Sequence, residues 1–169
     1  SAFDFNLIES LYDSHTVDKD LYIICNGYKK ESYISNIAQF INGGWHNTIP
    51  VLDNMPELDQ LDAMIDVPCM IGIRIAAEEE PKFDFYTSRL GIRYKDIVPF
   101  YQDRLSQNKK FKLKMLHFFI NTGIKDNAYY WNELGKCVNV YCNLKAVCPD
   151  LDSLNIGGGL PIKNSLGMD

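Results

Sequence analysis

The sequence of 169 residues is 46% hydrophobic, 12% aromatic and 23% charged, which is the composition of an ordinary globular protein with enough chain for one packed core. Lys and Arg (17) against Asp and Glu (22) give a formal net charge of -5, and the basic residues are scattered, so no nucleic-acid partner is expected. No apolar run approaches the roughly 20 residues of a membrane helix, and residues 1–20 lack the order of a signal peptide, so we expect a soluble, cytoplasmic protein without a membrane partner.

The predicted elements alternate between short β-branched runs and amphipathic segments of about 10 to 20 residues, as in βα units around a parallel sheet. Most of the runs lack a strict apolar and polar alternation, which indicates strands buried on both faces. In chain order we expect a helix-like segment at residues 3–12, a strand at 21–25, a helix at 30–41, strands at 48–52, 69–75 and 113–120, a long helix at 127–147 and a last strand at 151–156.

Two further helices are predicted from their capping residues. Asn54 can cap the first of them, and Glu57, three residues further on, completes a capping box. Asp96 can cap the second, which would place Pro99 in the first helical turn, where its missing N–H does no harm.

The five cysteines predict neither disulfides nor a metal site. Cys25 and Cys69 lie inside apolar runs, where a thiol behaves as a small hydrophobe. Cys137, Cys142 and Cys148 form no Cys-x-x-Cys pair, and no histidine lies at metal-ligand spacing to a cysteine. We therefore expect no metal.

The two ends of the sequence indicate part of a larger domain. The chain opens on a helix-like segment and closes about ten residues after its last predicted strand, so neither end completes a βα unit. A full (β/α)8 barrel takes about 250 residues, and five strands are roughly two-thirds of one. We expect residues 1–169 to be one such partial barrel. A complete five-stranded doubly wound domain is the alternative, but no helix would then cover its last strand.

Three consecutive glycines, Gly157 to Gly159, directly follow the last predicted strand. Glycine permits a positive φ and lets backbone N–H groups approach a ligand closely. In barrels a phosphate site commonly forms from loops after the last strands. The glycines are therefore explained either by a phosphate site or by an ordinary tight turn.

Polar residues also stand at the other strand exits, and the C-terminal ends of parallel strands share one face, so we expect a common mouth. Asn54 is also explained as a helix cap, and Asp53 as support for that turn. His117 lies within an apolar run and is equally explained as a core histidine, whereas Arg74 between two isoleucines needs an anionic partner if it points inward. The exits are residues 25–29, 53–54, 74 and 121–123.

The residues around these exits resemble a known family. Residues 116–124 (LHFFINTGI) and 154–161 (LNIGGGLP) resemble the sixth and seventh strand motifs of the pyridoxal-phosphate-dependent decarboxylases of basic amino acids. Residues 24–29 (ICNGYK), 72–76 (GIRIA) and 88–91 (SRLG) match further family motifs in the same order. The resemblance covers nearly the whole chain and implies an alanine-racemase-like barrel. Within the family, the CNGYK stretch is most similar to the biosynthetic arginine decarboxylases.

The resemblance implies roles only at matching positions. The three glycines would bind the cofactor phosphate through N–H groups, joined by Thr122 where relatives have serine. Phe119 occupies the position of the family's ring-stacking histidine; it can stack but cannot titrate. The implied cofactor-binding residues are Gly157, Gly158, Gly159, Thr122, Phe119 and Arg74, and the implied substrate or mouth residues are Asn26, Lys29, Arg89, Asn155 and His117.

The resemblance also implies what this sequence lacks. In the family, a lysine of the first strand forms the Schiff base with pyridoxal phosphate, and a carboxylate of the eighth strand holds the pyridine nitrogen protonated. Both fall outside this chain, as do a cysteine and an aspartate contributed across a dimer interface. We therefore expect no catalytic residue here, with Lys29 a weak substitute for the Schiff-base lysine.

The implied activity belongs to a whole protein that forms a homodimer or a higher homo-oligomer. It is the decarboxylation of arginine to agmatine, a step of polyamine biosynthesis. Ornithine, lysine and diaminopimelate are the other substrates of the family, and the choice among them lies largely outside this sequence. Two other classes stay open. One is a noncatalytic pyridoxal-phosphate-binding barrel, and the other is a complete doubly wound module for a phosphate or nucleotide.

Overall fold

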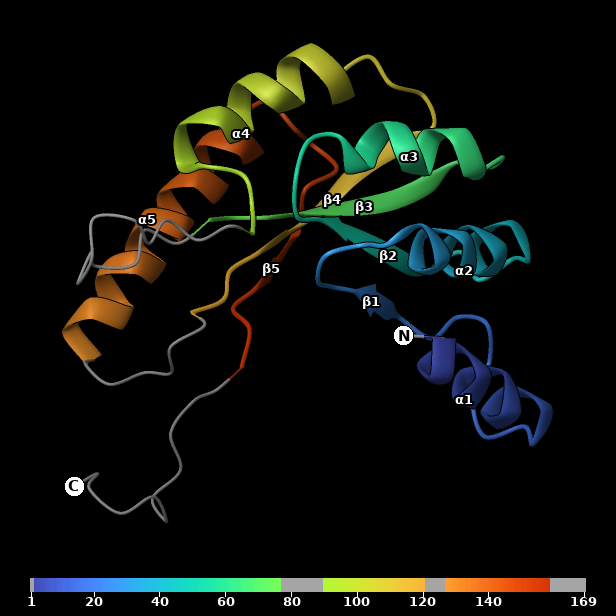
Figure 1. The fold of residues 1–169 in the computed structure, drawn as a ribbon. Coiled ribbons are helices and arrows are strands. Elements are labelled where there is room, and N and C mark those ends of the chain that lie inside the picture. Colours follow the sequence, from blue (N-terminus) through green and yellow to red (C-terminus); the bar gives the residue numbers. More distant parts are fainter. Residues whose placement is uncertain (1, 77–89, 121–126, 159–169) are drawn as a thin grey trace, which may run out of the picture.

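The computed structural model describes residues 2–76, 90–120 and 127–158 (Figure 1). Short strands alternate with helices along the whole of these ranges, as the β-branched and amphipathic segments predict. The strands are β1 (Ile23–Cys25), β2 (Thr48–Leu52), β3 (Cys69–Arg74), β4 (Phe111–His117) and β5 (Ser153–Asn155). The helices are α1 (Ala2–Asp13), α2 (Glu31–Asn42), α3 (Glu57–Met64), α4 (Tyr94–Phe100) and α5 (Asn127–Lys145), with a π-helical turn, η1 (Tyr101–Leu105), after α4.

The strands form one sheet in the order β1-β2-β3-β4-β5, and each neighbouring pair is parallel. A doubly wound sheet reverses its strand order within the sheet, whereas a (β/α)8 barrel keeps the order of the chain. Figure 1 shows the strands along an arc with α2 to α5 on its outer side. The predicted partial barrel is therefore confirmed, and the doubly wound alternative is wrong.

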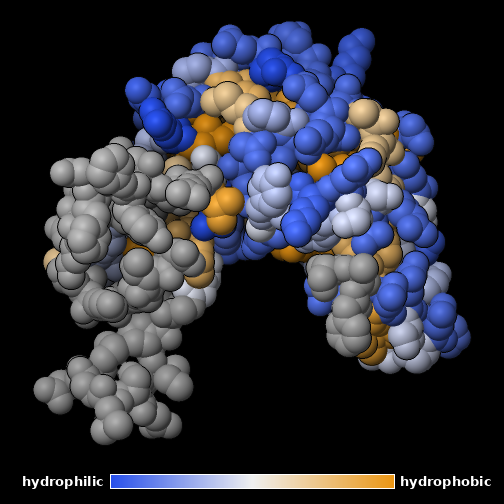
Figure 2. Space-filling view, in the orientation of Figure 1, coloured by the Kyte–Doolittle hydropathy of each residue, from blue (hydrophilic) through white to orange (hydrophobic). Residues whose placement is uncertain are grey.

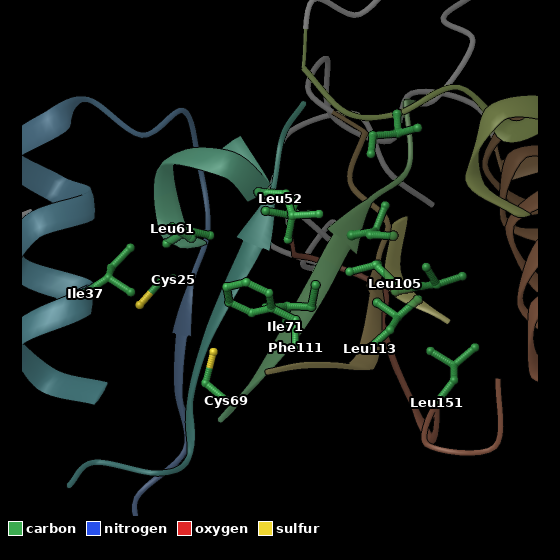
Figure 3. Close-up of a cluster of buried hydrophobic side chains, with 14 of the residues drawn as sticks. Cys25, Ile37, Leu52, Leu61, Cys69, Ile71, Leu105, Phe111, Leu113 and Leu151 are labelled. Carbon is green, nitrogen blue, oxygen red and sulfur yellow. The ribbon is translucent and has the colours of Figure 1, made fainter. Parts of the chain in front are cut away.

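Both faces of the sheet carry buried side chains. On the outer face, side chains such as Ile71 and Leu113 pack with helix residues such as Ile37 and Leu61 in one apolar cluster (Figure 3). Fully burying each such side chain contributes roughly 1.5–3 kcal/mol. A register irregularity in the pairing of β3 with β4, between Ile71 and Gly72, separates Leu113 from Met115. Val51 and Met115 directly precede Leu52 and Leu116 of the cluster, are buried, and lie outside it. They therefore face the inner side of the arc.

The structure corrects several predicted boundaries: β1 and β5 are shorter than the strands predicted at 21–25 and 151–156. β4 begins at Phe111 rather than residue 113 and ends at His117 rather than residue 120. Asp96 is not the cap of α4, which begins at Tyr94 and has Asp96 in its first turn. Pro99 consequently lies inside the helix and removes one of its N–H donors. The helix continues past it as the π-helical turn η1, which accommodates such local irregularity.

The cysteines behave as core residues. Burial raises the pKa of the Cys25 thiol to about 11 and those of Cys69 and Cys137 to about 12, so these thiols stay protonated. Cys148 is also buried and Cys142 is exposed, and all five are free. Among the described residues, no group of three or more His, Cys, Asp or Glu side chains could hold a metal ion. None of the helices in the described ranges is long and apolar enough to cross a membrane.

Candidate functional site

A row of polar residues crosses the sheet at the C-terminal ends of its strands. Arg74 pairs with His117 and His117 with Asn155 in the strand register, and Asp53 follows Leu52 directly. Because register partners on neighbouring strands project to the same face, these side chains lie together. They alternate with the residues that face the helices, so the row lies on the inner side of the arc. The space-filling view is hollowed beneath the strands (Figure 2).

Arg74 has the anionic partner that its inward position requires. Its Nη1 lies 3.8 Å from Oδ1 of Asp53, and the two side chains are 9% and 0% exposed. The two groups form an ion pair, but the distance between them is too long for a hydrogen bond. On another side, the guanidinium carbon lies 5.6 Å from the centre of the Phe119 ring, a cation–π contact. Arg74 is thus held between a carboxylate and an aromatic ring.

Several polar atoms of this row have no hydrogen-bond partner among the described residues. They are both carboxylate oxygens of Asp53, Nε of Arg74 and Nδ1 of His117, and all are buried. A buried donor or acceptor left unpaired costs about 1–3 kcal/mol. Such a concentration of unpaired groups at one end of the sheet is typical of a ligand site.

The electrostatics of the row follow from burial. Burial raises the pKa of the Asp53 carboxyl above its usual 3.8, although Lys29 and Arg74 lower it and Glu57 raises it further. Burial lowers the pKa of the His117 imidazole below its usual 6.5, and the charge of Arg74 lowers it further, with Asn155 acting in the opposite direction. His117 is therefore a neutral imidazole at neutral pH. Its ring is nearly parallel to Phe119, with centres 6.5 Å apart.

Lys29, predicted at the mouth, lies behind it. The residue is 2% exposed, and its Nζ donates to the carbonyl oxygens of Gly27 (3.0 Å) and Val51 and to Oε2 of Glu57 (3.1 Å). An ammonium has three donors, and all three are used here. The idea that Lys29 substitutes for a Schiff-base lysine therefore has no support from its geometry. Asn26 is exposed, and its carbonyl accepts from the Tyr33 hydroxyl at 3.4 Å.

Glu57 is a residue that the sequence predicted only as part of a capping box. Its backbone N–H donates to Oδ1 of Asn54 at 3.0 Å, which is one bond of the predicted capping box, but α3 begins at Glu57 itself and its N-cap is Pro56. The Glu57 carboxylate, however, accepts from the backbone N–H of Asp53 (2.9 Å) and of Lys29 (3.3 Å), as well as from the Lys29 ammonium. Lys29 and Glu57 are 28 residues apart, so no local sequence signal could have found this pair.

The glycine turn is built for close approach to the exit of β4. Gly157 has a φ of +74°, and a Cβ there would lie 2.7 Å from the carbonyl oxygen of Phe118. Its N–H donates to Oδ1 of Asn155 at 2.9 Å. A Cβ at Gly158 would meet nothing within 4 Å among the described residues. Gly159, Thr122 and Arg89 lie outside the described residues.

A cation, an imidazole, an aromatic ring and an open glycine turn thus converge at the strand ends of a half-barrel. Arg74 offers a free N–H donor to an anion, and the Phe119 ring offers a stacking surface. These groups fit an anionic aromatic cofactor. Lys29 is not free to react with such a cofactor, because the three N–H donors of its ammonium are already used. The fold and the site define a barrel domain with unpaired polar groups gathered at the C-terminal ends of its strands.

Comparison with known proteins names the family. The family model described as pyridoxal-dependent decarboxylase, pyridoxal binding domain, matches residues 11–167. The chain therefore belongs to the pyridoxal-dependent decarboxylases, of which it represents the pyridoxal-binding barrel. The resemblance seen in the sequence motifs is confirmed.

Individual relatives are more distant. The chain is 29% identical to biosynthetic arginine decarboxylase 2 of Synechocystis over 161 residues, which cover 89% of this chain and 24% of that protein. Arginine decarboxylase 1 of Oryza sativa is 27% identical over 151 residues, which cover 85% of this chain and 21% of that protein. The chain thus spans less than a quarter of the length of either relative.

Solved structures share the fold. The lysine decarboxylase of Selenomonas ruminantium matches with a TM-score of 0.71 at 17% identity, over 100% of this chain and 41% of that one. The biosynthetic arginine decarboxylase of Campylobacter jejuni matches with a TM-score of 0.63 at 23% identity, over 88% of this chain and 25% of that one.

Proposed function

We propose that this chain is the cofactor-binding part of a pyridoxal-phosphate-dependent decarboxylase that acts on arginine. The observation that carries the proposal is the row of unpaired buried polar groups at the mouth of a half-barrel that belongs to this family. Arginine is proposed because curated relatives at 29% and 27% identity are arginine decarboxylases. The products would be agmatine and CO2.

The residues of this chain would hold the cofactor by its two ends. Gly158, with Gly159 and Thr122, would bind the phosphate. The N–H of Gly157 is already bonded to Asn155, so Gly157 would shape the turn rather than bind. Phe119 would stack on the cofactor ring, and Arg74 would present its free N–H beside it. Pyridoxal phosphate supplies an electron sink for the carbanion left by CO2.

The remaining site residues would serve the mouth. His117 would stay neutral and accept a hydrogen bond, Asn155 would fix the glycine turn, and Asn26 and Arg89 would face incoming substrate. The Schiff-base lysine and a second subunit of a cytoplasmic homodimer would come from outside this chain.

The test is made on the full-length gene product. CO2 release is measured with arginine, ornithine, lysine and diaminopimelate as separate substrates, with and without added pyridoxal phosphate. We expect cofactor-dependent release from arginine and little from the others. Release from one of the other three instead would reject the substrate while keeping the class.

A noncatalytic pyridoxal-phosphate-binding barrel is a second candidate. The observation that favours it is Phe119, which stands where the resemblance places a titratable histidine. This candidate predicts that the protein binds the cofactor but releases no CO2 from any of the four amino acids.

A further inference from the structure

The buried pair of Lys29 and Glu57 lies directly behind the candidate site. Both residues are 2% exposed, and their charged atoms are 3.1 Å apart. Two apolar side chains of similar volume are often as stable as a buried ion pair, or more so, because both charges must lose their water. Stability alone therefore does not explain why a pair occupies this position.

The contacts of the pair join the exits of two strands. The Lys29 ammonium donates to the carbonyl oxygen of Gly27, just after β1, and to that of Val51, near the end of β2. The Glu57 carboxylate, at the start of α3, accepts from the backbone N–H groups of Lys29 and Asp53. The hydrogen bonds of the pair thus connect the loop after β1 to the turn after β2.

Asp53 is the site residue whose backbone the Lys29–Glu57 pair holds in place. Its N–H donates to Glu57 at 2.9 Å, and its carbonyl oxygen accepts from the N–H of Gly91 at 2.8 Å. With both backbone groups fixed, the Asp53 carboxylate is directed at Arg74, 3.8 Å away, and neither of its oxygens has another partner among the described residues. The position of the Arg74 guanidinium therefore depends on the position of the Asp53 backbone.

We propose that Lys29 and Glu57 are positioning residues, which act through Asp53 to fix the Arg74 guanidinium at the cofactor mouth. Neither touches the cofactor or the substrate. The proposal rests on the proposed function for its consequence in cofactor binding, but its geometric part concerns this chain alone. It also replaces the predicted role of Lys29 as a mouth residue.

The experiment uses the full-length gene product with Glu57→Gln, which keeps the size of the side chain and removes its charge. Because this leaves a buried ammonium, the double variant Lys29→Gln with Glu57→Gln provides a neutral pair that folds if the single variant does not. The matched control is Asp59→Asn at an exposed position of the same helix as Glu57, which removes the charge from the ion pair of Asp59 with Arg104 of η1.

Two measurements are made well below the melting temperature of every variant. The first is a crystal structure of each cofactor-free protein, in which we expect the Asp53 carboxylate of the Glu57 variants to move away from Arg74. The second is the dissociation constant for pyridoxal phosphate, which we expect to rise at least tenfold, or by about 1.4 kcal/mol, together with a shifted absorbance maximum of the bound cofactor. The control should change neither.

The outcomes separate the two proposals. If the Asp53 and Arg74 side chains of the Glu57 variants superpose on those of the wild type, or if cofactor affinity and absorbance match the wild type while the melting temperature falls, the pair is only structural and the inference is wrong. If the wild-type protein itself binds no pyridoxal phosphate, the proposed function fails, and the crystal structures still decide the positioning role.

Discussion

Replacing Asp53 by asparagine should stabilise the folded protein at neutral pH. The Asp53 side chain is 0% exposed, and neither carboxylate oxygen has a hydrogen-bond partner among the described residues. The net effect of its surroundings raises the pKa, because burial outweighs the attraction of Lys29 and Arg74. The ionised carboxylate is therefore disfavoured in the folded state. Asparagine has the same shape without the charge, and we expect a gain of about 1 kcal/mol in the free energy of unfolding.

The pH dependence gives the sign of this effect independently. A carboxyl whose pKa is higher in the folded state than its usual 3.8 contributes stability that is present below that value and is lost as the pH rises through the folded-state pKa. Asp53 therefore costs the wild type nothing at pH values well below 3.8 and costs its full amount only above its folded-state pKa. The advantage of the Asp53→Asn variant should grow over this range.

The assay is urea unfolding of the full-length gene product, wild type and Asp53→Asn, at several pH values across this range. The same variant should lose affinity for pyridoxal phosphate, because Arg74 loses its charged partner. A variant that is less stable than the wild type at neutral pH, by an amount that grows with pH, would show that the ion pair with Arg74 outweighs burial and would refute the reasoning.

Two further predictions concern the mouth. Gly157→Ala should lower the free energy of unfolding by about 1–3 kcal/mol, because φ is +74° and the new Cβ would lie 2.7 Å from the Phe118 carbonyl oxygen. The matched control is Gly158→Ala, whose Cβ would meet none of the described residues within 4 Å, and equal effects of the two substitutions in a thermal melt would contradict this prediction. Burial lowers the pKa of His117 below 6.5, so this residue contributes stability that is present above about pH 6.5 and is lost as the pH falls through the folded-state pKa. In urea unfolding at several pH values, His117→Gln should therefore lose less stability on acidification than the wild type, and the exposed control His46→Gln should not show this difference.

β2 is the strand that local sequence patterns predicted best, because it is buried on both faces. β2 runs over the residues expected, and all five of its residues are buried. The two isoleucine neighbours of Arg74 also predicted that an inward arginine would need an anionic partner, and Asp53 is that partner. The order of the strands could only be expected from the incomplete ends of the chain and the resemblance, and the structure confirms it.

The parts that local patterns missed depend on contacts between distant segments. Lys29 and Glu57 are 28 residues apart, so the burial of Lys29 is set by a partner on another element. Asp53 stood next to a capping residue and was explained as support for a turn, whereas its carboxylate is directed at Arg74 across the sheet. The start of α4 at Tyr94 rather than Asp96 depends on how a helix accommodates Pro99.

The central claim is that the mouth of this half-barrel holds pyridoxal phosphate, with Arg74 as part of its binding site. The most direct measurement is a titration of the cofactor-free, full-length gene product with pyridoxal phosphate, followed by visible absorbance, for the wild type and Arg74→Gln. The account predicts that the wild type binds with a new absorbance band at one cofactor per chain and that the variant binds at least tenfold more weakly. A wild type that stays colourless, or a variant that binds as tightly, would contradict it.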